Sequence, residues 1–176
     1  MICNERENRE RAILQAATEM MTAARTAPKG KGADVVEIAT LTGTDLVPVA
    51  AKMRQIAEEK GFKFFLRDAI CVEKADAVIF VGTREQAQGL NCEYCGAQRC
   101  DLRSAGTPCA INSIDVGIAL GSACSKAADL RIDTRVVYSA GTAAQELGVL
   151  GDAKQVIAIL MSIGSKNPFF DRPKPQ

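Results

Sequence analysis

The chain has 176 residues, of which 47% are hydrophobic, and a formal net charge of +1. This balance predicts a single globular domain, and a net charge so close to zero argues against the basic face that nucleic-acid binding needs. No apolar run is long enough to cross a bilayer, so we expect no membrane-spanning segment. Histidine is absent, which excludes a Ser-His-Asp triad, a histidine-based zinc site and an imidazole general base.

Helical and strand patterns alternate along the first half of the chain. Apolar residues at three- and four-residue steps predict a helix over residues 5–24. A β-branched run predicts a strand over 35–41, and a second helix is expected from Asp45 to about Lys60. Residues 62–75 are ambiguous, whereas 75–82 form an apolar run that predicts a buried strand.

The second half returns to regular patterns after an irregular stretch at 83–110. We expect a helix over 112–128 with Asn112 or Ser113 as its N-cap, because short polar side chains favour that position. Strands are predicted over 134–141 and 155–164, with a short helix over 142–148. The chain is therefore expected to be one domain over 1–176, an α+β mixed sheet covered by helices, with 83–110 as a cysteine-rich insertion.

Seven cysteines are present, an odd number. The charged N-terminal stretch MICNERENRERAIL shows no secretion signal, so we expect a cytoplasmic protein whose cysteines serve metal or redox chemistry rather than disulfides. Cys71 and Cys124 are interpreted as small buried hydrophobic residues. The other informative cysteines form one motif, C-x2-C-x4-C-x8-C, on Cys92, Cys95, Cys100 and Cys109.

These four thiolates are soft ligands that suit zinc or an iron–sulfur cluster. Gly96 and the run from Gly106 to Pro108 allow the backbone to turn sharply beside Cys95 and Cys109. Structural zinc sites with four cysteines usually combine two CxxC pairs, whereas only one pair is present here. The uneven spacing favours a [4Fe–4S] cluster, with zinc, or no metal at all, as the alternatives.

Six segments of the sequence resemble an uncharacterised family of ferredoxin domain-containing proteins of bacteria and archaea. This resemblance implies that the ferredoxin-type ligands are the same four cysteines. The segments are AARTAPKGKGAD (23–34), FFLRDA (64–69), LNCEYCGAQRC (90–100), DVGIALGSA (115–123), DTRVVYSAGTAA (133–144) and SKNPFFDRP (165–173).

A more distant resemblance is to FMN-dependent nitroreductases, carried by AARTAP (23–28), IDVGIALGSA (114–123) and SIGSKNPFFDRP (162–173). It implies a nitroreductase-like α+β fold that forms a homodimer through its central helices and holds FMN at the subunit interface. The arginine-rich element that grips the FMN phosphate in that family has no counterpart here. Lys29, Lys31 and Arg172 are the candidate cofactor-binding residues, with a solvated loop and tail as the alternative.

Three functions follow as hypotheses. The first is a redox protein that exchanges electrons with a protein donor or acceptor through a [4Fe–4S] cluster. The second is a non-enzymatic scaffold stabilised by zinc or by an inert cluster. The third is an FMN-dependent oxidoreductase.

Overall fold

The computed structural model describes residues 2–170, which fold around a four-stranded sheet. The strand order is β1-β2-β4-β3, and all three pairings are antiparallel. The α+β fold predicted from the sequence is confirmed, with antiparallel pairings where a mixed sheet was expected. The strands are β1 (Val36–Thr42), β2 (Ala77–Thr83), β3 (Asp133–Val137) and β4 (Lys154–Ser162).

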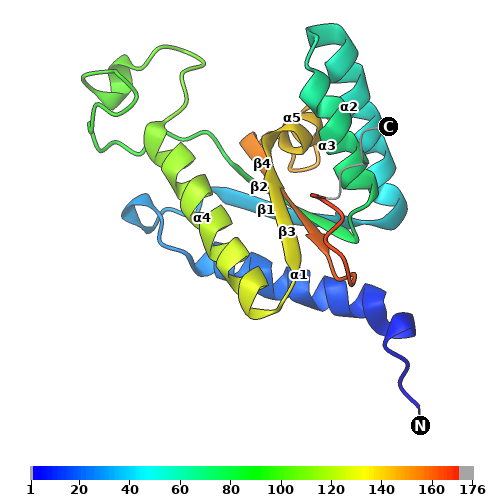
Figure 1. Ribbon diagram of the computed structural model, residues 1–176. Coiled ribbons are helices and arrows are strands. Elements are labelled where there is room, and N and C mark those ends of the chain that lie inside the picture. Colours follow the sequence, from blue (N-terminus) through cyan, green and yellow to red (C-terminus); the bar gives the residue numbers. More distant parts are fainter. Residues whose placement is uncertain (1, 171–176) are drawn as a thin grey trace.

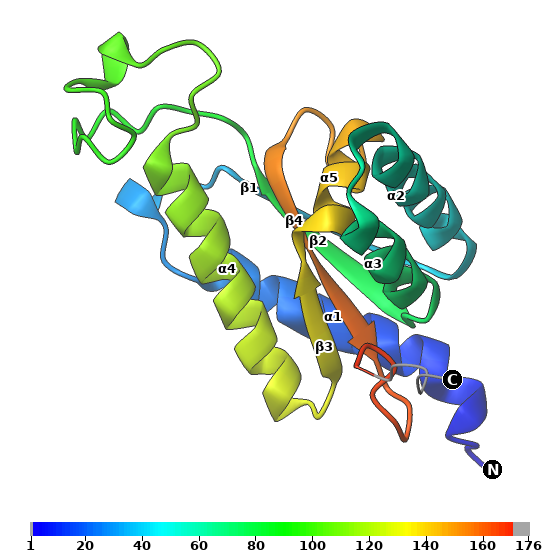
Figure 2. The same ribbon diagram turned by 45° about the horizontal axis from the view of Figure 1, so that its top comes forward.

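Helices cover both faces of this sheet, as Figures 1 and 2 show. On one face α1 (Arg9–Thr26) packs against α4 (Ala110–Asp129). The other face carries α2 (Val47–Lys60), α3 (Lys63–Glu73) and α5 (Tyr138–Glu146). The result is a three-layer arrangement with a buried sheet at its centre.

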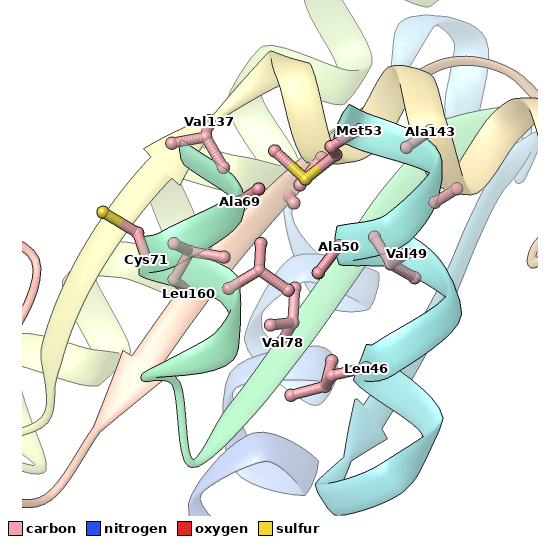
Figure 3. Close-up of a cluster of buried hydrophobic side chains, with 14 of the residues drawn as sticks. Leu46, Val49, Ala50, Met53, Ala69, Cys71, Val78, Val137, Ala143 and Leu160 are labelled. Carbon is pink, nitrogen blue, oxygen red and sulfur yellow. The ribbon is translucent and has the colours of Figure 1, made fainter. Parts of the chain in front are cut away.

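The central strand β2 explains why there are two hydrophobic cores. Successive side chains of a strand point to opposite faces, so Ile79 joins the core under α1 and α4 while Val78 joins the core under α2, α3 and α5. Figure 3 shows the second core, where Val78 and Leu160 meet residues of α2 such as Met53. Because both faces are covered, β2 is buried along its whole length, and Ala77 to Val81 are all apolar instead of alternating with polar residues.

The structure shows that the ambiguous stretch contains a helix and that one predicted strand is shorter than expected. Residues 62–75 contain α3, and the strand predicted over 134–141 ends at Val137 because α5 begins at Tyr138. Short apolar runs such as this do not distinguish a strand from a buried helix by their pattern alone. Packing decides here: a Cβ atom at Gly141 would lie 1.9 Å from the carbonyl oxygen of Val156, so α5 presses directly against β4.

The start of α4 also differs from the prediction. The helix begins at Ala110 with Cys109 as its N-cap, not at Asn112 or Ser113. Asn112 is fully buried instead: its Nδ2 donates to the carbonyl of Gln86 and its Oδ1 accepts from Gln88 Nε2, both at 2.9 Å. The amide therefore anchors the segment that precedes α4.

Between β2 and α4 the chain runs from Arg84 to Cys109 with only one short 3₁₀ turn, Cys100–Leu102, as predicted for a loop-rich segment. We call residues 84–109 the cysteine loop. The division of the chain into one domain with an insertion stays a prediction. Across residues 2–170, none of the helices combines the length and apolar character that a membrane crossing requires.

Candidate metal centre

The cysteine loop extends beyond the N-terminal end of α4, away from the sheet (Figures 1 and 2). Cys92, Cys95 and Cys100 are partly exposed on it, whereas Cys109 is buried at the point where α4 begins. Within residues 2–170, no three Cys, Asp or Glu side chains lie close enough together to hold a metal ion. A cluster bound by these four cysteines would therefore require their thiols to move closer together, and metal binding can supply free energy for such ordering.

The loop backbone is already tightly turned around the first three cysteines. The N–H of Gly96 donates to the carbonyl of Glu93 at 2.8 Å, which closes a turn around Cys95. Gly96 has a φ of 84°, where a side chain would be strained. Asn91 binds Cys100 twice: its Oδ1 accepts from the Cys100 N–H at 2.9 Å, and its own N–H donates to the Cys100 Sγ at 3.4 Å. These two hydrogen bonds hold Asn91, the neighbour of Cys92, against Cys100.

Glu85 fixes the fourth cysteine, although it lies 24 residues earlier in the chain. Its Oε1 accepts from the backbone N–H of Cys109 at 2.8 Å and also pairs with the guanidinium of Arg103. Arg103 in turn donates to the carbonyl of Thr107 at 2.6 Å. Sequence reasoning missed Glu85, because nothing in the pattern after a buried strand indicates contact with a distant cysteine.

Arg103 is a cation that interacts electrostatically with two of the cysteines. Its hydrogen bond to Glu85 is the main cause that raises the pKa of the guanidinium; burial opposes the rise, and the neighbouring Cys109 and Cys95 add to it. Arg103 therefore lies within electrostatic range of two of the four cysteines. A positive charge in that position stabilises thiolates and their metal complexes.

The two lysines predicted to bind a cofactor are engaged in the fold. The amine of Lys29 donates to the carbonyls of Ala24, Arg25 and Ala27 at 2.6–2.8 Å, and burial lowers the pKa of Lys29. It thus satisfies carbonyls at the C-terminal end of α1. Lys31 donates to the carbonyl of Gln88 at 3.1 Å and so ties the same turn to the cysteine loop.

The turn that carries these lysines packs closely on α4. The N–H of Gly30 donates to Asp115 Oδ1 at 2.9 Å, and a Cβ at Gly30 would lie 2.5 Å from Ile111 Cγ2. Arg172, the third predicted cofactor ligand, lies outside the described residues. The structure therefore brings Lys29 and Lys31 near each other but uses both amines for backbone carbonyls.

Cys71 is buried as the sequence predicted, whereas Cys124 is only partly buried against the core under α1 and α4. Burial raises the pKa of the Cys71 and Cys124 thiols, so both favour the protonated form. Cys71 belongs to the core under α2, α3 and α5, as Figure 3 shows. Neither is placed to join the motif, and Cys3 is exposed near the N-terminus.

Comparison with known proteins identifies the family of this chain. Residues 105–172 match the family described as uncharacterised proteins containing a ferredoxin domain. An uncharacterised protein of Archaeoglobus fulgidus is 41% identical over 182 residues, which cover 98% of this chain and 98% of that protein.

Solved structures with the same fold include a nitroreductase with bound FMN from Bacteroides fragilis. The TM-score is 0.63 and the sequence identity is 11%, and the match covers 92% of this chain and 83% of that one. An oxidoreductase containing FMN has a TM-score of 0.58 and 13% identity, with 86% and 67% coverage. The chain spans only 62% of a hypothetical oxidoreductase of Bacillus subtilis, YcnD, with a TM-score of 0.53. Identities this low show a shared fold and nothing more.

The fold defines an α+β protein with a nitroreductase-like architecture. The near-complete match to the Archaeoglobus fulgidus protein extends the likeness over the whole chain. The chain belongs to the family of uncharacterised proteins that contain a ferredoxin domain.

Proposed function

We propose that this protein is an iron–sulfur redox protein, with a [4Fe–4S] cluster bound by Cys92, Cys95, Cys100 and Cys109. The observation that carries the proposal is the donor set: four thiols within 18 residues of one loop, in a chain without histidine. Thiolates of this number and type suit cubane clusters. The family is described as containing a ferredoxin domain, which supports an iron–sulfur role in general; its model matches residues 105–172, which include Cys109 but not the other three cysteines.

The contacts around the loop support a cluster site in two further ways. Glu85 holds the backbone of Cys109 at the start of α4, and Arg103 places a positive charge near Cys95 and Cys109. A bound cluster would supply one-electron chemistry, while these two residues hold one ligand and offset negative charge. Such thiols must stay reduced before assembly, in keeping with the cytoplasmic location that we propose.

Anaerobic purification with metal analysis tests the proposal directly. We expect brown protein with about four irons and four sulfides per chain and little zinc. Cys95→Ser should remove most of the visible absorption. Cys124→Ser is the matched control, because Cys124 lies on α4 outside the motif and should leave the absorption unchanged. Colourless wild-type protein that contains zinc but no iron would falsify the proposal.

A non-enzymatic scaffold is the second candidate, and one observation favours it. Because no three potential ligands within residues 2–170 lie together, the metal would have to order the loop, as structural metals do. Redox titration of the anaerobic protein separates the two functions. Reversible cycling supports electron exchange with a protein partner, and a cluster that collapses on reduction supports the scaffold.

A homodimer is proposed for this chain on the basis of α4. The alanines of this helix, such as Ala119 and Ala123, face the core, so internal packing explains their small size. Gly117 and Gly121 face open space, where an added Cβ would meet nothing within 4 Å. Internal packing does not explain these glycines, whereas close approach of a second α4 would.

FMN binding receives less support from the residues themselves. The amines of Lys29 and Lys31 are engaged with backbone carbonyls, so the turn offers no free cation to a phosphate without breaking those bonds. The fold shared with FMN-containing proteins is the observation in favour. Flavin analysis of the purified protein tests it, and we derive no step through the flavin.

A further inference from the structure

A cavity of about 360 Å³ opens beside Cys109, between the cysteine loop, the end of α5 and the start of β4. Pro108, the neighbour of Cys109, lies in its wall together with Thr107. Gln145 of α5 and Gln155 of β4 also line the cavity. Cavities of a few hundred cubic ångströms are typical of small-molecule sites.

One wall of this cavity is held by a strained residue. Gln155 and Val156 oppose the single residue Gly82, which makes a β-bulge in β4, and Gln155 has a φ of 52°. Both polar atoms of its side-chain amide are hydrogen-bonded: Oε1 accepts from the Ser113 hydroxyl, and Nε2 donates to Glu85 Oε2 at 3.3 Å. Bulges of this kind redirect side chains and are common beside functional sites, where backbone strain is retained.

The same residues give the cavity an unmatched positive charge. Three charged side chains line it, namely Glu85, Arg103 and Lys154. Glu85 and Arg103 neutralise each other in an ion pair. Lys154 makes no ion pair or side-chain hydrogen bond in the part of the chain that the structure describes, so its ammonium is available to an anion.

We propose that this cavity binds a small organic monocarboxylate. The carboxylate pairs with the ammonium of Lys154, and a short carbon chain lies against Thr107 and Pro108. Charge-assisted hydrogen bonds favour this placement, and the uncharged walls accommodate apolar atoms. The proposal requires no iron at Cys109, so it stands or fails independently of the cluster.

Calorimetric titration of the anaerobically purified protein with hexanoate, hexanamide and inorganic phosphate tests the class of ligand. We expect saturable binding of one hexanoate per chain, with affinity at least about tenfold higher than for hexanamide, because the amide lacks the charge. Equal affinity for the amide, or tighter binding of phosphate than of hexanoate, would overturn the monocarboxylate class. No saturable hexanoate binding would overturn the site itself.

Two variants locate the binding. Lys154→Met keeps the length of the side chain but removes its charge, and should weaken hexanoate binding by at least about tenfold. Lys74→Met is the matched control. Lys74 lies just before the first residue of β2, whereas the cavity lies near the last residue of that strand, Thr83, so hexanoate binding should be unchanged. Unfolding curves of both variants should match the wild type. Unchanged affinity in Lys154→Met would place the ligand elsewhere.

Discussion

The carboxylate of Glu85 accepts a hydrogen bond from the backbone N–H of Cys109 at 2.8 Å. Glu85 lies two residues after the end of β2, and Cys109 is the N-cap of α4, so this contact fastens the end of the cysteine loop to the sheet. The same carboxylate pairs with Arg103 and accepts from Gln155. One side chain thus connects the proposed cluster ligand, the nearby cation and the wall of the cavity.

Glu85→Ala should loosen this connection. A hydrogen bond to a charged group contributes about 1.5–3 kcal/mol, so we expect a loss of that order in the free energy of unfolding, measured with urea. Iron should also be released faster to a chelator, because the Cys109 backbone is no longer held. Glu85→Gln retains an acceptor and should show a smaller loss. Equal effects of the two substitutions would contradict the hydrogen-bond explanation and point to charge alone.

Gly141→Ala tests the packing of α5 on β4. The added methyl group would lie 1.9 Å from the carbonyl oxygen of Val156, so the helix must move. We expect a loss of about 1–3 kcal/mol or more in the free energy of unfolding. Gly164→Ala is the control, because its Cβ would meet only ordinary contacts of 3.5 Å and beyond. A loss as large in the control would mean that the cost does not come from the α5–β4 contact.

Gly121→Arg tests the proposed dimer. An arginine side chain has open space in the single chain, so the fold should be unaffected, but it would obstruct a second α4. We expect sedimentation velocity to show monomers where the wild type shows dimers. Ala51→Arg, on the exposed side of α2, should remain dimeric. A wild-type protein that is monomeric at micromolar concentration contradicts the homodimer.

Glu146 provides a pH-dependent prediction. Its hydrogen bond and ion pair with Lys52, together with Lys60, lower the pKa of this carboxyl below its usual value. A lowered pKa in the folded state stabilises the protein above the unfolded-state pKa, and this contribution is lost as the pH falls through the folded-state value. Glu146→Gln should therefore reduce the free energy of unfolding by at most about 1 kcal/mol at pH 7, because these side chains are partly exposed.

Urea denaturation at several pH values checks this expectation. The difference between Glu146→Gln and the wild type should shrink as the pH falls below the unfolded-state pKa and through the lowered folded-state pKa, because the carboxyl is then protonated in both states. Asp152→Asn offers a comparison at a carboxyl that forms no ion pair within residues 2–170. A difference that stays constant with pH would show that lost packing, not charge, causes the effect.

The centre of the fold was predictable because its two central strands, β2 and β4, are strongly apolar. Residues 75–82 and 155–164 were read correctly, within about two residues, since a strand buried on both faces must be apolar along its length. The error at 134–141 arose because Val137 and Tyr138 belong to different elements in one short apolar run. Only the contact of Gly141 with β4 distinguishes helix from strand there.

The candidate metal centre likewise has one part that the sequence predicts and one part that it does not. The motif on Cys92, Cys95, Cys100 and Cys109 is local, so its spacing and the absence of histidine were sufficient to predict a thiolate site. Lys29 looked like a phosphate ligand because a basic turn often binds anions. Its actual contacts depend on where α1 ends, which the residue types alone do not specify.

The sequence by itself determined the donor set, the apolar strands and the small residues of α4, because each depends on residue type and short-range spacing. Only the tertiary structure decided which distant groups meet these features. Glu85 reaches Cys109 because β2 ends where α4 begins, and Gln155 reaches Glu85 because a bulge turns β4 toward that point. Such contacts arise from the packing of strands and helices, and no local pattern encodes them.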